Sequence, residues 1–139
     1  SDAEWLAAVG AKLAGAAIDF TPFHADIGPT GDGGFPMKSR MRDWPLYHAG
    51  VWRDLTDTPD AVLIDGRFRV ACLLQAIIHC KPDCLLLFHG FDAHAGYRRV
   101  LRHADLLARV GALATLRVKR SVDGQAVLHD LFDHFLDPH

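Results

Sequence analysis

Few cysteines and no long apolar run limit the classes of protein to which this chain can belong. Its 139 residues include three cysteines, an odd number without a C-x-x-C pair, which argues against a disulfide framework and suits a reducing compartment. No apolar run approaches the roughly 20 residues needed to span a bilayer, and the N-terminus lacks the basic start and apolar core of a signal peptide. We therefore predict a cytoplasmic protein with no membrane partner.

An excess of charge is also lacking. Fifteen basic residues stand against seventeen acidic ones, a formal net charge of -2, so the composition provides no general attraction for nucleic acid. Half of the residues are hydrophobic, which is enough for a chain of this length to bury a core of its own. We expect one domain over residues 1–139 and no nucleic-acid partner. Its immediate start in helix-like sequence is typical of a truncated or partial fold, although a processed or engineered terminus would look the same.

Helical and extended patterns alternate along the chain. Apolar residues at helical spacing predict helices over 2–15, 43–55, 67–80, 94–111 and 124–139, with a glycine ending the fourth at position 111. Apolar or alternating runs predict strands over 17–28, 60–66, 83–90 and 112–120. With short connections, this order predicts an α/β, Rossmann-like fold: a mostly parallel sheet of about four strands with flanking helices.

Candidate site residues follow the expected strands. Ligands of open α/β sheets bind outside the carboxyl ends of the strands. Those ends are Asp26 with the glycine-rich loop 28–36, Asp65 with Arg67 close behind it, and His89. An acid at one strand end and a histidine at the next can hold a metal, orient a ribose hydroxyl, or act as a general base with its orienting group.

These residues also have purely structural interpretations. Asp65 stands before a glycine and can equally be a turn or N-cap residue, while His89 can be a buried histidine bonded to a loop. The loop 28–36 fits neither G-x-G-x-x-G nor the phosphate-loop pattern, so it gives little support to nucleotide binding. No zinc-binding spacing joins the histidines and cysteines, and we assign no metal ligand from sequence.

Three stretches carry a resemblance to a known family. They are ADIGPTGDGGFP at 25–36, VLIDGRFRVACLLQAI at 62–77 and LLLFHGFDAHAGYRRV at 85–100. Together they resemble a group of bacterial class I S-adenosylmethionine-dependent methyltransferase-like proteins whose substrates are largely unassigned. The resemblance covers almost the whole chain, and its most specific motifs are DIGPTG and DGRFRVA.

The resemblance implies that this chain is the carboxyl-terminal half of a Rossmann-like transferase. The first two strands of that fold, which carry the adenosylmethionine site, have no counterpart here, so the cofactor is expected only in a complete fold. Asp2 is nearest to the acid that would bind the ribose, and Asp26 and Gly28 are the other cofactor-binding candidates. Asp65 matches an acid after the fourth strand that can bind a metal or the substrate in related methyltransferases. Gly90 stands where a second acid often assists.

Three functions remain as alternatives. The first is a methyltransferase-like domain acting on a small-molecule or saccharide-like acceptor, with Asp65 positioning or deprotonating the acceptor, His89 as a base and Arg67 shaping the pocket. The second is a noncatalytic interaction or scaffold domain, favoured by Gly90 and by the absent first half. The third is a metal-dependent hydrolase that uses Asp65 and His89 together with Asp26.

A sheet without its first two strands is expected to have an unpaired edge. Such edges are costly and tend to pair with another chain. We therefore predict that the strand near Phe23 pairs with the strand of Ile64, or that a homodimer covers the exposed edge.

Overall fold

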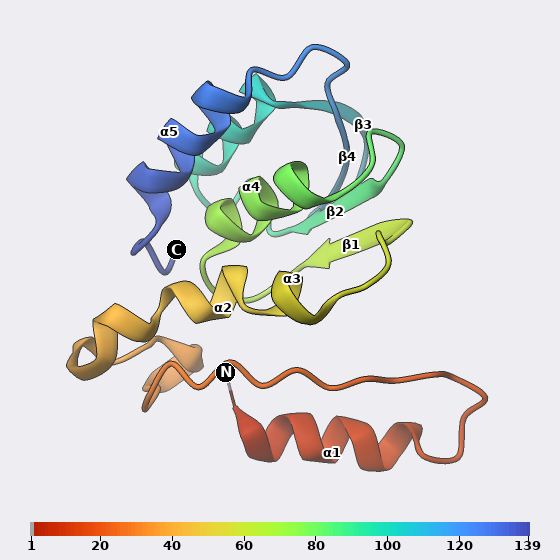
Figure 1. Cartoon of the computed structure of the whole chain (residues 1–139), viewed down its shortest axis with the longest axis vertical. Coiled ribbons are helices and arrows are strands. Elements are labelled where there is room, and N and C mark those ends of the chain that lie inside the picture. The colour runs from red at the N-terminus through yellow and green to blue at the C-terminus, as the bar shows by residue number, and fades with distance from the viewer. Residues whose placement is uncertain (1) are drawn as a thin grey trace.

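The computed structural model describes residues 2–139 and contains one four-stranded sheet. The order of its strands is β1-β2-β4-β3 (Figure 1). Parallel pairing is confined to β1 and β2, because β4 runs antiparallel to both of its neighbours. The α/β architecture with four strands and flanking helices is thus confirmed, in a sheet of mixed direction. The strands span Ala61–Ile64 (β1), Leu85–His89 (β2), Ala104–Val110 (β3) and Leu113–Val118 (β4).

Two helices pack together on one face of the sheet (Figure 1). They are α4, Arg69–His79, and α5, Gly124–His134, and both lie where the apolar periodicity predicted helices. The core between helices and sheet is formed by fully buried side chains from α4, β2 and β4. Its largest members include Phe68, Leu73, Leu74, Leu86, Phe88 and Leu116.

The predicted helix over 94–111 is wrong. A 3-10 helix occupies Ala95–Arg102, and the chain then extends as β3 and turns back into β4. Gly111 does not end a helix; it takes a φ of 57° in the two-residue turn between Val110 and Leu113. Apolar and basic residues alternate through this region in a way that suits an exposed helix. Backbone pairing with β4 nevertheless makes residues 104–110 a strand.

The predicted strand over 17–28 is also wrong. This segment is extended without belonging to the sheet, and Phe23 lies against Gly50 rather than beside β1. Pro22 removes a backbone donor from the segment, which disfavours a ladder. β1 is therefore an edge strand of the sheet, and dimerisation stays a prediction.

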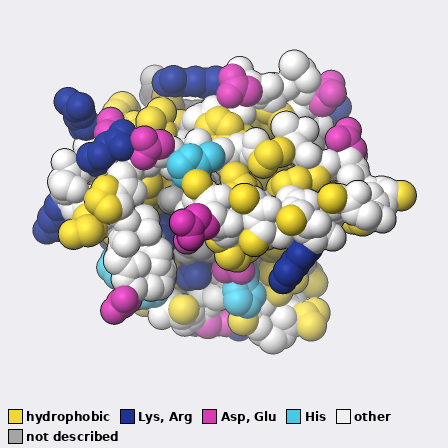
Figure 2. Space-filling model, turned by 90° about the horizontal axis from the view of Figure 1, so that it is seen from below, with side chains coloured by type: hydrophobic (Ala, Val, Ile, Leu, Met, Phe, Trp, Pro, Cys, Tyr) yellow, Lys and Arg dark blue, Asp and Glu magenta, His cyan; other side chains and the backbone are white. Residues whose placement is uncertain are grey.

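The amino-terminal part of the chain contributes little to the core. Helix α1, Ala3–Leu13, has no buried residue, and the side chains of Trp5 and Ile18 are 66% and 60% exposed. Seen from below, hydrophobic side chains gather over this part of the molecule (Figure 2). Within residues 2–139, no helix has the length and apolar character that crossing a membrane requires.

Two short helices replace the single helix expected over 43–55. They are α2, Pro45–Ala49, and α3, Val51–Asp54, and they follow a 3-10 segment at Lys38–Asp43. His48 on α2 is buried, and its Nε2 lies 3.2 Å from the carbonyl oxygen of Phe135. Since a carbonyl only accepts, Nε2 carries the proton, and Nδ1 is left to accept from the Gln75 amide at 3.5 Å. This bridge joins α2 to α4 and to the end of α5.

Candidate active site at the ends of β1 and β2

The turn from β1 into α4 has an unusual backbone. Gly66 has a φ of 141°, and a Cβ at this position would lie 2.7 Å from the Tyr47 hydroxyl oxygen, so only glycine fits. Phe68 adopts the left-handed conformation with φ 53° and ψ 35°, the one residue other than glycine with a positive φ among those described. Left-handed phenylalanine is rare and costly, and such residues cluster at functional sites.

Aromatic packing holds Phe68 in this conformation. Its side chain is fully buried, and its ring centroid lies 5.6 Å from that of Trp44 and 5.3 Å from that of Tyr47. The Phe68 amide also donates to the carbonyl of Pro138 at 3.2 Å, which ties the turn to the segment after α5. The conformation of Phe68 thereby fixes the directions in which the neighbouring residues, Arg67 and Arg69, leave the backbone.

Asp65 and His89 meet at one edge of the sheet. Parallel pairing places Ile64 opposite Phe88, so the next residue of each strand emerges at the same end. The Nδ1 of His89 lies 3.2 Å from Oδ1 of Asp65, and both side chains are about half exposed. An ionised carboxylate only accepts, so Nδ1 of a neutral His89 carries the proton and Nε2 keeps its lone pair. The pair can therefore act as a base and its orienting acid.

Arg69 joins this pair from the first turn of α4. Its Nη2 lies 3.6 Å from Oδ1 of Asp65, and its Nη1 donates to the Tyr97 hydroxyl at 3.2 Å. Neither Arg69 nor Tyr97 was among the residues expected from sequence. The spacing of four between Asp65 and Arg69 was a usable signal, because residues so spaced approach each other where a turn enters a helix. For Tyr97 there was no such signal.

Arg67 connects the DGRFRVA motif to the glycine-rich loop 28–36. Its Nε and Nη2 donate to the carbonyl of Gly33 at 3.0 and 2.7 Å, and its guanidinium lies 4.0 Å from the ring centroid of Phe35. The glycine-rich loop is itself closed by an isolated bridge between Thr30 and Pro36. The glycine-rich loop 28–36 and the DGRFRVA segment thus form one structural unit.

A cleft of about 450 Å³ opens between this unit and α1. Its lining includes Asp2, Tyr47, Gly66, Arg67 and Arg69. Asp2 also caps α1, because its carboxylate accepts from the amide of Trp5 at 3.0 Å. The structure therefore brings two of the candidate residues, Asp2 and Arg67, to one cleft, and Arg69 links that cleft to Asp65 and His89.

Asp26 and Gly28 lie outside the lining of this cleft. Asp26 is paired with Arg40 at 2.9 Å, and the hydrogen bond from Arg40, followed by that from the Gly28 amide, lowers the pKa of Asp26 below its ordinary value. Gly28 has a φ of 88°, and a Cβ there would lie 2.8 Å from the Arg40 side chain. Both residues anchor the base of the glycine-rich loop.

The three residues required for a metal-dependent hydrolase do not converge. Among residues 2–139, one group of three metal-ligating side chains has its ligand atoms within 4.8 Å of one another: His129, Asp130 and Asp133 on α5. Asp130 already accepts from Arg102 at 2.9 Å and contacts His103 at 2.7 Å. The expectation that Asp26 would join Asp65 and His89 is therefore wrong, because Asp26 is bound to Arg40.

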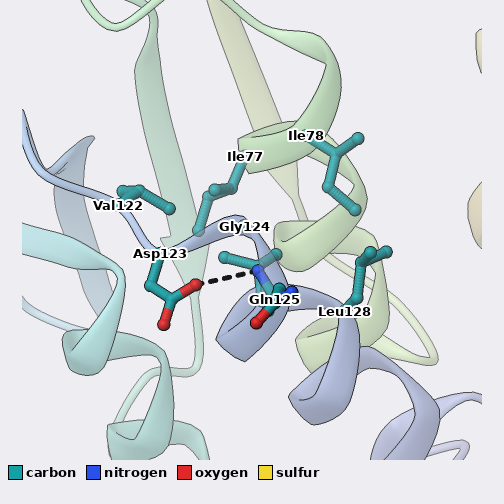
Figure 3. Close-up of a pocket in the computed structure, with 8 residues that line it drawn as sticks. Ile77, Ile78, Val122, Asp123, Gly124, Gln125 and Leu128 are labelled. Carbon is teal, nitrogen blue, oxygen red and sulfur yellow. Dashed lines mark hydrogen bonds between the residues drawn. The ribbon is translucent and has the colours of Figure 1, made fainter.

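A larger, apolar cleft of about 590 Å³ lies between α4 and the start of α5 (Figure 3). Ile77, Ile78 and Leu128 line it from the two helices. Its one acid, Asp123, caps α5 by accepting from the amides of Gln125 and Ala126 at 2.9 and 3.3 Å. Asp123 thus has a structural role at the start of α5, and the other side chains that line this cleft are apolar or neutral.

An α/β sheet with flanking helices, whose two parallel strands end in the polar side chains of Asp65 and His89, defines a Rossmann-like domain. Among solved structures, the chain is similar to the crystal structure of a methyltransferase-like protein from Silicibacter pomeroyi DSS-3. The two are 30% identical with a TM-score of 0.86, over 99% of this chain and 74% of that chain. The chain therefore belongs to the family of that methyltransferase-like protein, and the expected methyltransferase-like fold is confirmed. No protein-family model and no curated protein matches it.

Proposed function

We propose that this domain forms the acceptor-binding part of an S-adenosylmethionine-dependent methyltransferase whose acceptor is a small or saccharide-like molecule. The observation that carries the proposal is the contact between His89 Nδ1 and Asp65 Oδ1 at the carboxyl ends of two parallel strands. Membership in a methyltransferase-like family supports the reaction class. Arg67 supports the shape of the cleft through its bonds to the Gly33 carbonyl.

The described residues do not form a complete site for adenosylmethionine. Asp2 is the one acid that lines the cleft and could bind ribose hydroxyls, whereas Asp26 and Gly28 are turned toward Arg40. The sheet also contains no further strand beside β1 among residues 2–139. We therefore assign to this chain the handling of the acceptor.

His89 is the proposed general base. Its Nε2 takes the proton from a hydroxyl or amine of the acceptor, which leaves the oxygen or nitrogen with the electron pair that attacks a methyl group. Asp65 holds Nδ1–H, fixes the tautomer and stabilises the imidazolium that forms, as acids do in other histidine-based sites. Asp65 is thus a positioning residue for His89 and need not accept a proton itself.

Transfer of labelled methyl groups to a small-molecule extract tests the proposal. The protein, expressed from its complete reading frame, is incubated with S-adenosylmethionine that carries a labelled methyl group, and labelled products are separated from the donor. We expect a product whose formation falls at least about a hundredfold in His89→Gln, within the range of general-base catalysis. The matched control is Asp92→Asn, because Asp92 pairs with Arg98 and Arg109 and is not among the residues that line the cleft.

The role of Asp65 has a readout that does not depend on turnover. Nitrogen chemical shifts of neutral His89 should show Nδ1–H in the natural protein, and Asp65→Asn should shift the population toward Nε2–H. An unchanged tautomer would contradict the positioning role.

A noncatalytic interaction domain is the second candidate. Gly90 replaces an acid that often assists in related methyltransferases, and α1 exposes an apolar surface. Absence of labelled product with both the natural protein and His89→Gln would favour this candidate over methyl transfer.

A further inference from the structure

Arg69 is a partly buried cation with few partners. Its side chain is 18% exposed, yet its guanidinium makes a single hydrogen bond among residues 2–139, to the Tyr97 hydroxyl. The Nε of Arg69 is buried without a partner, and the nearest carboxylate oxygen, on Asp65, is 3.6 Å from Nη2. A guanidinium has five N–H donors, and a buried charge is stable only when it is paired and hydrogen-bonded. Arg69 therefore keeps donors that the described residues leave unsatisfied.

Arg67 presents a second guanidinium to the same cleft, already fixed in position. Two of its nitrogens are bound to the Gly33 carbonyl, and the ring of Phe35 covers one face. The remaining nitrogen, Nη1, has no hydrogen-bond partner among the described residues. A preorganised donor loses little entropy when a ligand binds.

Tyr47 adds a neutral donor to the lining of the same cleft. Burial raises the pKa of Tyr47, so its hydroxyl stays protonated at neutral pH. The hydroxyl oxygen accepts from the Arg67 amide at 3.4 Å, and its own proton therefore remains for a ligand in the cleft.

The charges around the cleft favour an anion. Its lining contains Arg67 and Arg69 against one acid, Asp2, whose carboxylate is directed to the first turn of α1. Asp65 and His89 lie just beyond Arg69. No side chain caps the start of α4, so the positive end of its dipole adds to the field of the two arginines.

We propose that Arg67, Arg69 and Tyr47 form a subsite for a carboxylate or phosphate group of the methyl acceptor. Arg69 reaches both the cleft and Asp65, so an acceptor held there by its anionic group would have its hydroxyl or amine near His89. The identity of the ligand as the acceptor rests on the proposed function, whereas binding of an anion does not. The carboxylate of adenosylmethionine has the same chemistry and is the alternative source.

Titration of the isotope-labelled chain with inorganic phosphate, at constant ionic strength, tests the subsite directly. We expect saturable shifts of the Arg69 and Arg67 side-chain N–H signals and of the Gly33 amide. Arg69→Gln should weaken phosphate binding at least about tenfold, because hydrogen bonds to charged groups contribute about 1.5–3 kcal/mol. Arg69→Lys should restore part of it, since it keeps the charge but loses the planar fork. Arg42→Gln is the control, because Arg42 is 91% exposed.

If Arg69→Gln does not fold, the phosphate titration of the natural chain is sufficient to test the anion subsite. Absence of saturable shifts in that chain would overturn the subsite and leave the labelling experiment untouched. Phosphate binding without methyl transfer would overturn the proposed function and leave the anion site standing.

Two adenosine ligands identify the source of the anion. S-adenosylhomocysteine carries the carboxylate, and methylthioadenosine lacks it. If phosphate competes with the first and not with the second, the cofactor occupies the subsite and the acceptor assignment is overturned. Phosphate binding that neither ligand affects supports the acceptor.

Discussion

Substitution of Phe68 by alanine and by glycine tests the left-handed turn that leads from Asp65 into α4. Removing a buried phenylalanine side chain costs about 3–5 kcal/mol of the free energy of unfolding. Phe68 is fully buried against Trp44 and Tyr47, so we expect the upper part of this range for Phe68→Ala. A chain of this length is stable by roughly 7–20 kcal/mol, so the variant should still fold.

The comparison of alanine with glycine isolates the backbone. In a right-handed helix, glycine is about 1 kcal/mol less stable than alanine. At φ 53° and ψ 35° the order should reverse, since the left-handed conformation costs about 1–2 kcal/mol for a residue with a Cβ. After allowance for the greater entropy of unfolded glycine, about 0.5–1 kcal/mol, Phe68→Gly should equal or exceed Phe68→Ala in stability.

Urea unfolding followed by circular dichroism measures all three proteins. Phe132→Ala is the matched control, because Phe132 is 75% exposed and its removal should cost no more than about 0.5 kcal/mol. If Phe68→Gly were about 1 kcal/mol less stable than Phe68→Ala, the left-handed conformation would be refuted. A cost for Phe68→Ala similar to that of the control would refute the packing.

Two further expectations concern pH and assembly. Burial lowers the pKa of His48 below its ordinary value of 6.5, so the unfolded chain takes up this proton first and stability falls as the pH drops through about 6.5. His48→Gln should flatten that part of the slope between pH 8 and 5, and equal slopes would contradict the assignment. If a second copy covers the β1 edge, light scattering should give twice 15.3 kDa, and Leu63→Lys should give the monomer. A monomeric natural chain would exclude this dimer.

The local sequence pattern was sufficient to predict a helix or strand where the segment is mostly apolar and bounded by turn residues. β1, α4 and β2 were predicted for this reason, and so was the meeting of Asp65 with His89, since neighbouring parallel strands end at one edge. β3 was missed because its residues suit a helix until β4 supplies backbone partners. Elements specified by short-range sequence patterns were therefore predictable, whereas the strand that depends on pairing with a partner strand was not.

The composition of the site depended on contacts that sequence spacing does not reveal. Asp26 was a reasonable cofactor ligand until Arg40, fourteen residues away, was found to hold it. Arg69 was overlooked because its importance comes from Tyr97 and from a buried nitrogen without a partner. Both cases reflect side-chain geometry, which becomes visible only in three dimensions.

The hydrogen bond from the Phe68 amide to the Pro138 carbonyl has a consequence for the order of folding. It joins residues that are seventy positions apart, and such contacts form late because a long loop must close first. We therefore expect the turn beside Asp65 to reach its final geometry only after α5 has been synthesised and has docked on α4. A ribosome-bound chain that lacks α5 would contain all the residues of the sheet but would not yet have the final geometry of the turn beside Asp65. Ligand binding at this turn would then indicate that the whole domain has folded.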